Sequence, residues 1–228
     1  MRVFDIIEEI LRNRHHFFIE IRDKKNIGPK IRAMATASIA FLIVYGAVLG
    51  ASHSLLQSLS SAIKLPFLFF STLLITAPTL YFFHVLFGSN QNISQSVALI
   101  LTAITVTSVI LLALAPVTLF FLVTTGNYAF FKLLNVIIFT VAGFRGVAFL
   151  SEGLSIVSDS AEGAGKRRNI MRLWIVLYAL VGTQMVWTLR PFVGAPSLEF
   201  ELFRDIGGNF YTNVMASIGE VLGFWVVR

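Results

Sequence analysis

The chain has 228 residues, of which 56% are hydrophobic and 13% charged, and its formal net charge is +6. A soluble domain of this size carries about a quarter charged residues and cannot bury this much apolar surface, so the composition excludes an ordinary soluble protein. The chain has no cysteine, which excludes disulfides, thiolate catalysis and cysteine-ligated metals. Several almost uncharged runs approach the roughly 20 residues that cross a bilayer. We therefore expect an all-α fold, a polytopic transmembrane helical bundle.

The first residues predict a cytoplasmic segment, residues 1–32, that precedes a transmembrane domain over residues 33–228. Up to about residue 25, apolar and charged residues recur at helical spacing. The apolar positions are Val3, Phe4, Ile6, Ile7, Ile10 and Leu11, and the charged ones between and after them are Glu8, Glu9, Arg12 and Arg14. This pattern favours an amphipathic helix in the membrane interface, beside anionic lipid head groups. The alternative is a helix packed on a partner or on the cytoplasmic end of the bundle.

Six apolar segments predict membrane spans. They cover about residues 34–51, 65–87, 97–123, 128–150, 170–189 and 210–227. The first contains Gly46 and Gly50, a GxxxG pair that permits close helix approach, more often within one chain than in a dimer. The sequence therefore leaves undecided whether the chain forms a homo-oligomer. The last segment is less apolar than the others, and without it the count falls to five and the C-terminus lies outside.

Basic residues predict the orientation of the chain in the membrane, because cytoplasmic loops carry an excess of Lys and Arg. Eight of the 18 Lys and Arg residues lie within residues 1–32. Four more lie in or just after the loop between the fourth and fifth spans, namely Lys166, Arg167, Arg168 and Arg172. With six spans, both clusters and both termini are cytoplasmic. The expected location is a bacterial cytoplasmic membrane, for the reason given below.

Polar residues inside the predicted spans define a candidate intramembrane network. Its members are Lys132, Asn135 and Arg145 on the fourth span and Asn213, Ser217 and Glu220 on the last. The last three follow one another at offsets of four and three, which places them on one helical face. Ionisable residues in spans are costly and often functional. We favour a structural role, in which the network holds the last helix in the bundle, over a proton or ion path.

The sequence carries no motif of a known catalytic chemistry. It lacks H-E-x-x-H and G-x-S-x-G, and its "GAGK" is followed by Arg167 where a phosphate-binding loop needs Ser or Thr. The basic residues flank membrane spans, so they do not indicate nucleic-acid binding. We therefore expect no enzyme activity, no cofactor and no metal site.

The segment "WTLRPFVGAPSLEFELFRDIGGNFY", residues 187–211, carries three acidic residues, two arginines and two prolines. Ser197 as N-cap and Gly207 just past the end predict a short amphipathic helix on the outer surface. We expect an outer docking surface here. Its candidate residues are Arg190, Pro191, Phe192, Arg204, Asn209, Phe210 and Tyr211.

Three blocks of the chain resemble a family of bacterial integral membrane proteins without an assigned function. The blocks are "LQSLSSAIKLPFLFFSTLLITAPTLYFF", "APVTLFFLVTTGNYAFFKLLNV" and "GTQMVWTLRPFVGAPSLEFELFRDIGGNFY", within about residues 46–215. The resemblance implies a bacterial membrane setting and transfers no catalytic residue. A looser likeness in topology is to the Yip family of membrane proteins, which have a cytoplasmic N-terminal region and five spans.

These observations predict a non-enzymatic membrane scaffold or accessory subunit. It would bind partner proteins, membrane or cytoplasmic, and anionic lipid at its N-terminal segment. The alternative is a transporter or channel component, with a polar path through the fourth and sixth spans that Lys132, Asn135, Arg145 and Glu220 would line.

Overall fold

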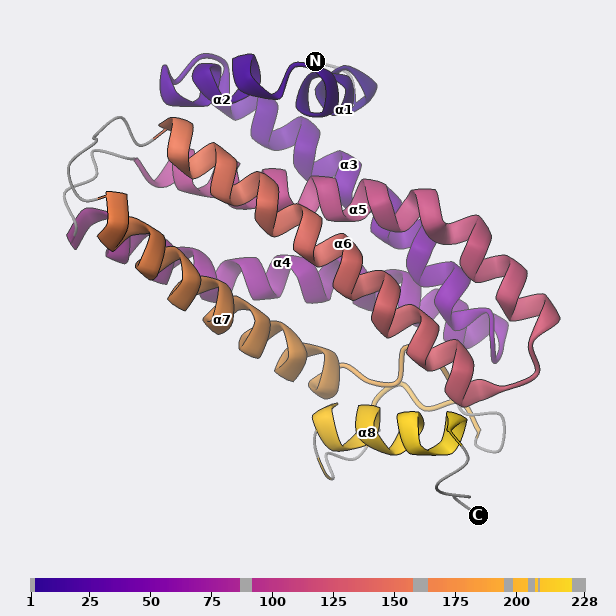
Figure 1. Cartoon of the computed structure of the whole chain (residues 1–228). Coiled ribbons are helices and arrows are strands. Elements are labelled where there is room, and N and C mark those ends of the chain that lie inside the picture. Colours follow the sequence, from indigo (N-terminus) through magenta and orange to yellow (C-terminus); the bar gives the residue numbers. More distant parts are fainter. Residues whose placement is uncertain are drawn as a thin grey trace.

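A computed structural model describes residues 3–86, 92–157, 164–194, 199–204, 208 and 210–222. All regular structure in these ranges is α-helical. The helices are α1 (Val3–Arg12), α2 (Arg14–Arg22), α3 (Ile27–Gly50), α4 (Leu55–Leu86), α5 (Ile93–Thr124), α6 (Tyr128–Val157), α7 (Ala164–Thr188) and α8 (Phe210–Val221). Figure 1 shows the five long helices α3 to α7 as an elongated bundle. The predicted all-α fold is confirmed.

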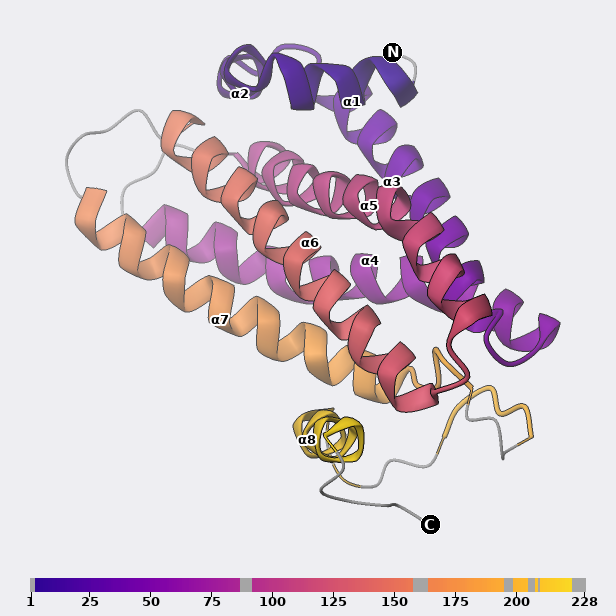
Figure 2. The same ribbon diagram turned by 45° about the vertical axis from the view of Figure 1, so that its right-hand side comes forward.

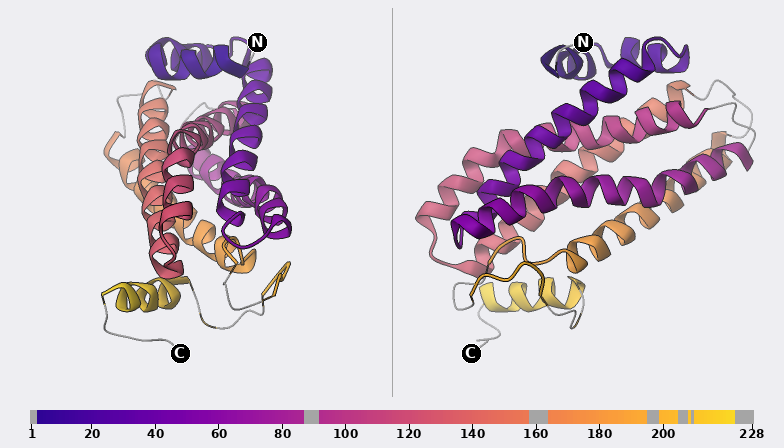
Figure 3. Two further views of the ribbon diagram at one scale, coloured as in Figure 1. Left: turned by 90° about the vertical axis from the view of Figure 1, so that its right-hand side faces the viewer. Right: turned by 180° about the vertical axis from the view of Figure 1, so that it is seen from behind.

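The short helices lie across the two ends of this bundle. In Figures 1 and 2, α1 and α2 cross one end and α8 crosses the other. The two further views in Figure 3 agree, with α3 and α6 running between the two ends. Within the bundle, α3 packs on α4 and α5, α5 packs on α6, and α7 packs on α4. The core is therefore centred on α3 and α5, and α7 is a peripheral helix.

Among the described residues, four helical stretches are long and apolar enough to cross a membrane. They are α3, the first 25 residues of α4, α5 and α6. A fifth long helix, α7, has 25 residues and lies beside α4. Its segment from Ile170 to Thr188 carries one charge, Arg172. Membrane-length apolar helices, expected from the sequence, are thus present in the fold.

The predicted second span begins too late. Helix α4 starts at Leu55 rather than near residue 65. Polar residues such as Gln57 and Ser61 gave this stretch the composition of a loop, yet both side chains are buried and bonded within the fold. A helix accommodates polar residues in this position when other segments of the chain satisfy them.

The predicted sixth span is not confirmed. Helix α8 has 12 residues, about 18 Å at the rise of an α-helix, whereas the hydrocarbon core is about 30 Å thick. Residues 223–227 of that prediction lie outside the described residues. Within the described residues, four helices are long and apolar enough to span, and neither α7 nor α8 is among them.

The GxxxG pair of α3 packs against α4 of the same chain. A Cβ atom at Gly46 would overlap the backbone of Ser61, and one at Gly50 would overlap the backbone of Gln57. Only glycine permits this approach of two helix backbones. The motif therefore serves the α3–α4 hairpin.

We expect Gly46→Ala to lower the stability of the bundle by roughly 1–3 kcal/mol, because the new methyl group forces α3 and α4 apart. Gly143→Ala on α6 is the matched control, since nothing lies within 4 Å of a Cβ there. The control should be neutral or slightly stabilising, because alanine favours a helix interior by up to about 1 kcal/mol. Midpoints of SDS-induced unfolding in mixed micelles measure both, and equal midpoints would contradict the packing argument.

Candidate functional site

The structure brings together two members of the predicted intramembrane network. The Lys132 Nζ atom donates to Asn213 Oδ1 at 3.0 Å, which joins α6 to α8. Ser217 is buried and donates to the Asn213 carbonyl in its own helix. Glu220 is exposed and forms no ion pair with a described residue. The Lys132–Asn213 bond is thus the contact that ties α8 to the bundle within this set.

Asn135 belongs to a different cluster. Its Oδ1 accepts a hydrogen bond of 2.8 Å from the Tyr45 hydroxyl of α3, which lies 3.3 Å from Thr118 Oγ1 of α5. Arg145 is exposed on α6, on the same side as Val141. Among the described residues, therefore, no chain of contacts joins the predicted set into one polar path.

A row of polar side chains on α4 holds the segment that follows α7. We name this segment, residues 189–194 and 199–204, the outer segment. Gln57, Ser61 and Lys64, spaced by four and three residues, share one face of α4. We name these three residues the α4 polar row. Gln57 Nε2 donates to the Pro191 carbonyl at 2.8 Å, and Ser61 Oγ donates to the Phe192 carbonyl at 2.6 Å.

Lys64 completes the row from a buried position. Its ammonium group donates to the carbonyl of Leu202 and lies 3.4 Å from that of Pro191. It also lies 4.7 Å from the centre of the Phe203 ring. No carboxylate of the described residues pairs with it, so backbone carbonyls and an aromatic face satisfy this cation.

The predicted outer surface helix is wrong over the residues that the structure describes. Residues 199–204 are not helical, and Ser197 and Gly207 lie outside the described residues. The Arg204 amide donates to the Arg190 carbonyl at 3.2 Å, and the Leu202 carbonyl accepts from Lys64. These backbone groups bond to other parts of the chain, which replaces the hydrogen bonds of a helix.

Most predicted docking residues on the outer side make contacts within the chain. Pro191 is buried, and Phe192 packs against the core. The Arg190 guanidinium lies 3.5 Å from the centre of the Trp187 ring. Arg204 bonds to Glu201 at 2.9 Å. Phe210 is the first residue of α8, and the exposed Tyr211 has its hydroxyl 3.1 Å from Thr183 Oγ1. Asn209 lies outside the described residues. The segment thus closes the end of the bundle opposite the cap.

At the opposite end, residues 3–22 form two helices where the sequence predicted one. Helices α1 and α2 meet at Asn13, and we name them together the cap. Five of their apolar side chains are at most 1% exposed, namely Ile6, Ile10, Phe17, Phe18 and Ile21, whereas Phe4 and Leu11 are exposed. The five buried side chains are covered by the ends of α3, α5 and α6. The apolar face of the cap is therefore packed on the bundle, as in the alternative interpretation of this segment.

A buried ion cluster joins the cap to α3. The Lys30 side chain is 1% exposed, and its Nζ lies 2.5 Å from Glu9 Oε1 of α1 and 2.8 Å from Glu20 Oε2 of α2. It also lies 4.6 Å from the centre of the Phe17 ring. The hydrogen bond from Lys30 lowers the pKa of Glu20 below its ordinary value of 4.5, against the opposing effect of burial. The cluster therefore favours the charged form of the Glu20 carboxylate.

The same carboxylates raise the question of a metal site. Ligand atoms of Glu9, His16 and Glu20 lie within 4.8 Å of one another. The Lys30 ammonium, however, bonds to both carboxylates from the buried side. A divalent ion there would face a fixed positive charge, so these residues suit the lysine better than a metal.

Two further contacts fix the cap. Gln95 Nε2 of α5 donates to the carbonyls of Ile21 and Arg22 at 3.1 and 2.9 Å, which satisfies the last turn of α2. Arg14 of α2 pairs with Glu152 of α6 at 3.1 Å. Together with Lys30, they link the cap to three different helices of the bundle.

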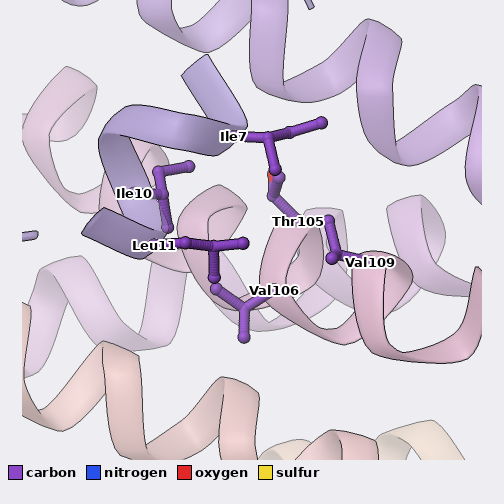
Figure 4. Close-up of a pocket in the computed structure, with 6 residues that line it drawn as sticks. All are labelled: Ile7, Ile10, Leu11, Thr105, Val106 and Val109. Atoms are coloured by element: carbon purple, nitrogen blue, oxygen red, sulfur yellow. The ribbon is translucent and has the colours of Figure 1, made fainter. Parts of the chain in front are cut away.

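The cap also meets α5 through apolar side chains. Figure 4 shows six residues around a hollow between the two helices. They are Ile7, Ile10 and Leu11 of α1 and Thr105, Val106 and Val109 of α5. The hollow has no room for a water molecule, so this contact is dry and excludes a ligand site in the hollow as it stands.

Sequence reasoning missed the residues that hold both ends. Lys30 was counted among the cations that set topology, Glu9 was assigned to the charged face of the first helix, and Glu20 was given no role. The α4 polar row was left outside the predicted spans. A signal was present for the row, because its spacing of four and three marks one helical face. No comparable signal pairs Lys30 with its carboxylates, since their distances in sequence follow from how the cap folds back.

We expect Lys30→Met to release the cap, because it leaves two carboxylates close together and partly buried without their cation. Breaking a buried pair in this way costs about 3–5 kcal/mol. Lys25→Met is the matched control, since Lys25 is exposed and lies 3.8 Å from Asp23. Limited proteolysis within residues 3–22, in detergent, should be fast in the first variant and unchanged in the second. Equal resistance in both variants would contradict the role of Lys30.

Acid pH should have a related effect on the unmodified chain. The folded pKa of Glu20 is lowered, so its contribution to docking is complete above about pH 4.5 and is lost as the pH falls through the lowered value. Protease sensitivity of the cap should therefore rise below about pH 4.5, measured with an acid protease. Lys30→Met should lose this acid step, and a step that persists there would point to another group.

Comparison of the chain with protein-family models, curated proteins and solved structures finds no match.

Proposed function

We propose that the protein is a non-enzymatic scaffold or accessory subunit in a bacterial cytoplasmic membrane, and that the outward face of its cap binds anionic partners. These partners are acidic protein segments or anionic lipid head groups. In this proposal α3 to α7 span the membrane, the cap is cytoplasmic and α8 lies at the outer side. The bacterial setting rests on the family resemblance of the sequence.

The distribution of basic residues supports this orientation. The cap lies at the end of the bundle where α3 and α5 begin, α6 ends and α7 begins (Figure 1). Both basic clusters of the sequence belong to this end, the first in residues 1–32 and the second at the start of α7. An excess of Lys and Arg marks the cytoplasmic side of a membrane protein.

The observation that carries the proposal is a charged face on a firmly docked cap. Packing and Lys30 occupy the inner side of the cap, so its polar side chains point outward. On the cap and the residues that follow it up to 32, the exposed or partly exposed basic residues are Arg12, Arg14, His15, His16, Arg22, Lys24, Lys25 and Arg32. The acidic ones are Asp5, Glu8 and Asp23, together with Glu9 and Glu20, which bond to Lys30. Lys24 and Arg32 pair with none of the described carboxylates. A fixed basic surface beside a membrane attracts anionic groups, by about 1 kcal/mol per cation.

The interior supports binding over transport or catalysis. Buried hydroxyl and amide groups of α3, α5 and α6 bond to one another or to backbone carbonyls, as in the pair Ser38–Thr105 at 3.0 Å and in the Tyr45–Asn135 bond. The described contacts do not form a polar path through α6 and α8. The outer segment is likewise used to close the bundle, which leaves the cap as the surface available to a partner.

The test is the recovery of partners from gentle detergent. Lys24→Glu combined with Lys25→Glu reverses two exposed charges that take no part in docking the cap. We expect recovery of co-purifying anionic lipid and protein, quantified by mass spectrometry, to fall about tenfold or more, because roughly 2 kcal/mol of attraction is removed. Deleting residues 1–25 is a poorer test, since it uncovers the apolar ends of α3 and α5.

The control exchanges an exposed ion pair without changing the net charge of the cap. Arg12 and Glu8 form a bond of 2.6 Å with both side chains exposed, so Glu8→Lys combined with Arg12→Glu keeps the pair and the charge balance. Recovery should match the unmodified chain. If charge reversal at Lys24 and Lys25 leaves recovery unchanged, the proposed function of the cap is wrong.

A further inference from the structure

Two contacts set the depth of α8 against the bundle. Lys132, which bonds to Asn213, lies four residues after the start of α6, and Thr183, which meets Tyr211, lies five residues before the end of α7. At the rise of an α-helix these positions are roughly 6–8 Å inside the outer ends of both helices. Helix α8 therefore lies beside the ends of the spans, at the level where the membrane meets water.

The side chains of α8 divide into three groups around its axis. Phe210, Val214 and Ser217 are at most partly exposed and mark the side toward the bundle. Asn213, Ala216 and Glu220 form an exposed, mostly polar side. The third side is an apolar stripe of Tyr211, Met215, Ile218 and Leu222, which are 52%, 67%, 36% and 62% exposed. Their spacing of four, three and four keeps them on one face of the helix.

We propose that α8 is an interfacial helix of the outer leaflet, with its apolar stripe inserted among lipid acyl chains and its Glu220 side in water. A helix with one apolar and one polar exposed side lies in the plane of a membrane surface. With 12 residues it is too short to cross the bilayer. This surface is distinct from the cap, and its placement rests on the spans and orientation of the proposed function and not on the binding role of the cap.

Lipid is the occupant that the surroundings of the stripe favour. The two helices that carry α8 expose further apolar side chains near the same level, Ile137 of α6 at 60% and Leu180 of α7 at 53%. These belong to helices that run through the membrane, so acyl chains already surround them in the same region. The stripe continues this lipid-facing surface toward the head groups. The Lys132–Asn213 bond then ties α8 to α6 at the edge of its polar side and leaves Glu220 facing water.

Spin labels test this placement directly, and the lack of native cysteine means that each single-cysteine variant takes one label. Labels at Tyr211→Cys, Met215→Cys, Ile218→Cys and Leu222→Cys probe the stripe, and Ala216→Cys and Glu220→Cys probe the polar side. Val141→Cys on α6 is a reference for a lipid-facing position deeper in a span. The protein is reconstituted in phosphatidylcholine and phosphatidylglycerol vesicles, and collision with oxygen and with a water-soluble nickel chelate is measured by EPR.

The expected result is that the four stripe labels favour oxygen and share one shallow depth, while the labels at positions 216 and 220 favour the nickel chelate. Depth should then follow the helical period along α8. A depth that increases steadily from position 211 to 222 would show a spanning helix and overturn the proposal. Low access of both reagents to the stripe would show that a second copy of the chain covers it. Access of the nickel chelate at every position would show a helix in water. Either result also overturns the proposal. The labelled side chains are exposed, so the labels should not disturb folding. If one variant does not fold, the other stripe positions still report on the same face.

Discussion

The ammonium group of Lys30 organises the end of the protein at which the cap lies. A buried cation without a partner costs several kcal/mol, and here two carboxylates from two different helices satisfy it. Both helices must fold back onto α3 for this to happen, which carries Phe17 and Ile21 into the space above α5 and α6. This cluster, together with Gln95, the Arg14–Glu152 pair and the apolar packing on α5, sets the docked position of the cap and hence the charged face it presents outward.

At the end opposite the cap, a second buried lysine is satisfied by backbone carbonyls instead of carboxylates. Lys64 is buried there and bonds to backbone carbonyls of the segment after α7. Polar groups near the hydrocarbon core must find partners within the protein, because lipid offers none. Gln57 and Ser61 extend the arrangement to two more carbonyls. The non-helical outer segment and the polar start of α4 therefore satisfy each other, and together with α8 they close the end opposite the cap.

The sequence was sufficient for properties that depend on local composition. The all-α fold followed from long uncharged runs, and the close approach at Gly46 followed from a spacing that a single helix displays. Properties that depend on distant partners were missed. The start of α4 was misplaced because its polar residues bond to carbonyls far along the chain. Residues 199–204 were wrongly assigned to a helix because their backbone groups bond instead to Lys64 and Arg190, which lie elsewhere in the sequence. Asn135 was grouped with residues of α8, whereas its side chain accepts a hydrogen bond from Tyr45 of α3.

The central claim is that the cap is part of the folded bundle and presents a rigid surface. Hydrogen exchange of the intact protein in lipid nanodiscs, followed by mass spectrometry, tests this claim most directly. We predict that the amides around Ile10, Phe18 and Ile21 are protected nearly as strongly as those in the middle of α5, because their side chains are buried and Gln95 satisfies the end of α2. Exchange of these amides within seconds, while α5 stays protected, would show a cap that detaches freely and would contradict the account.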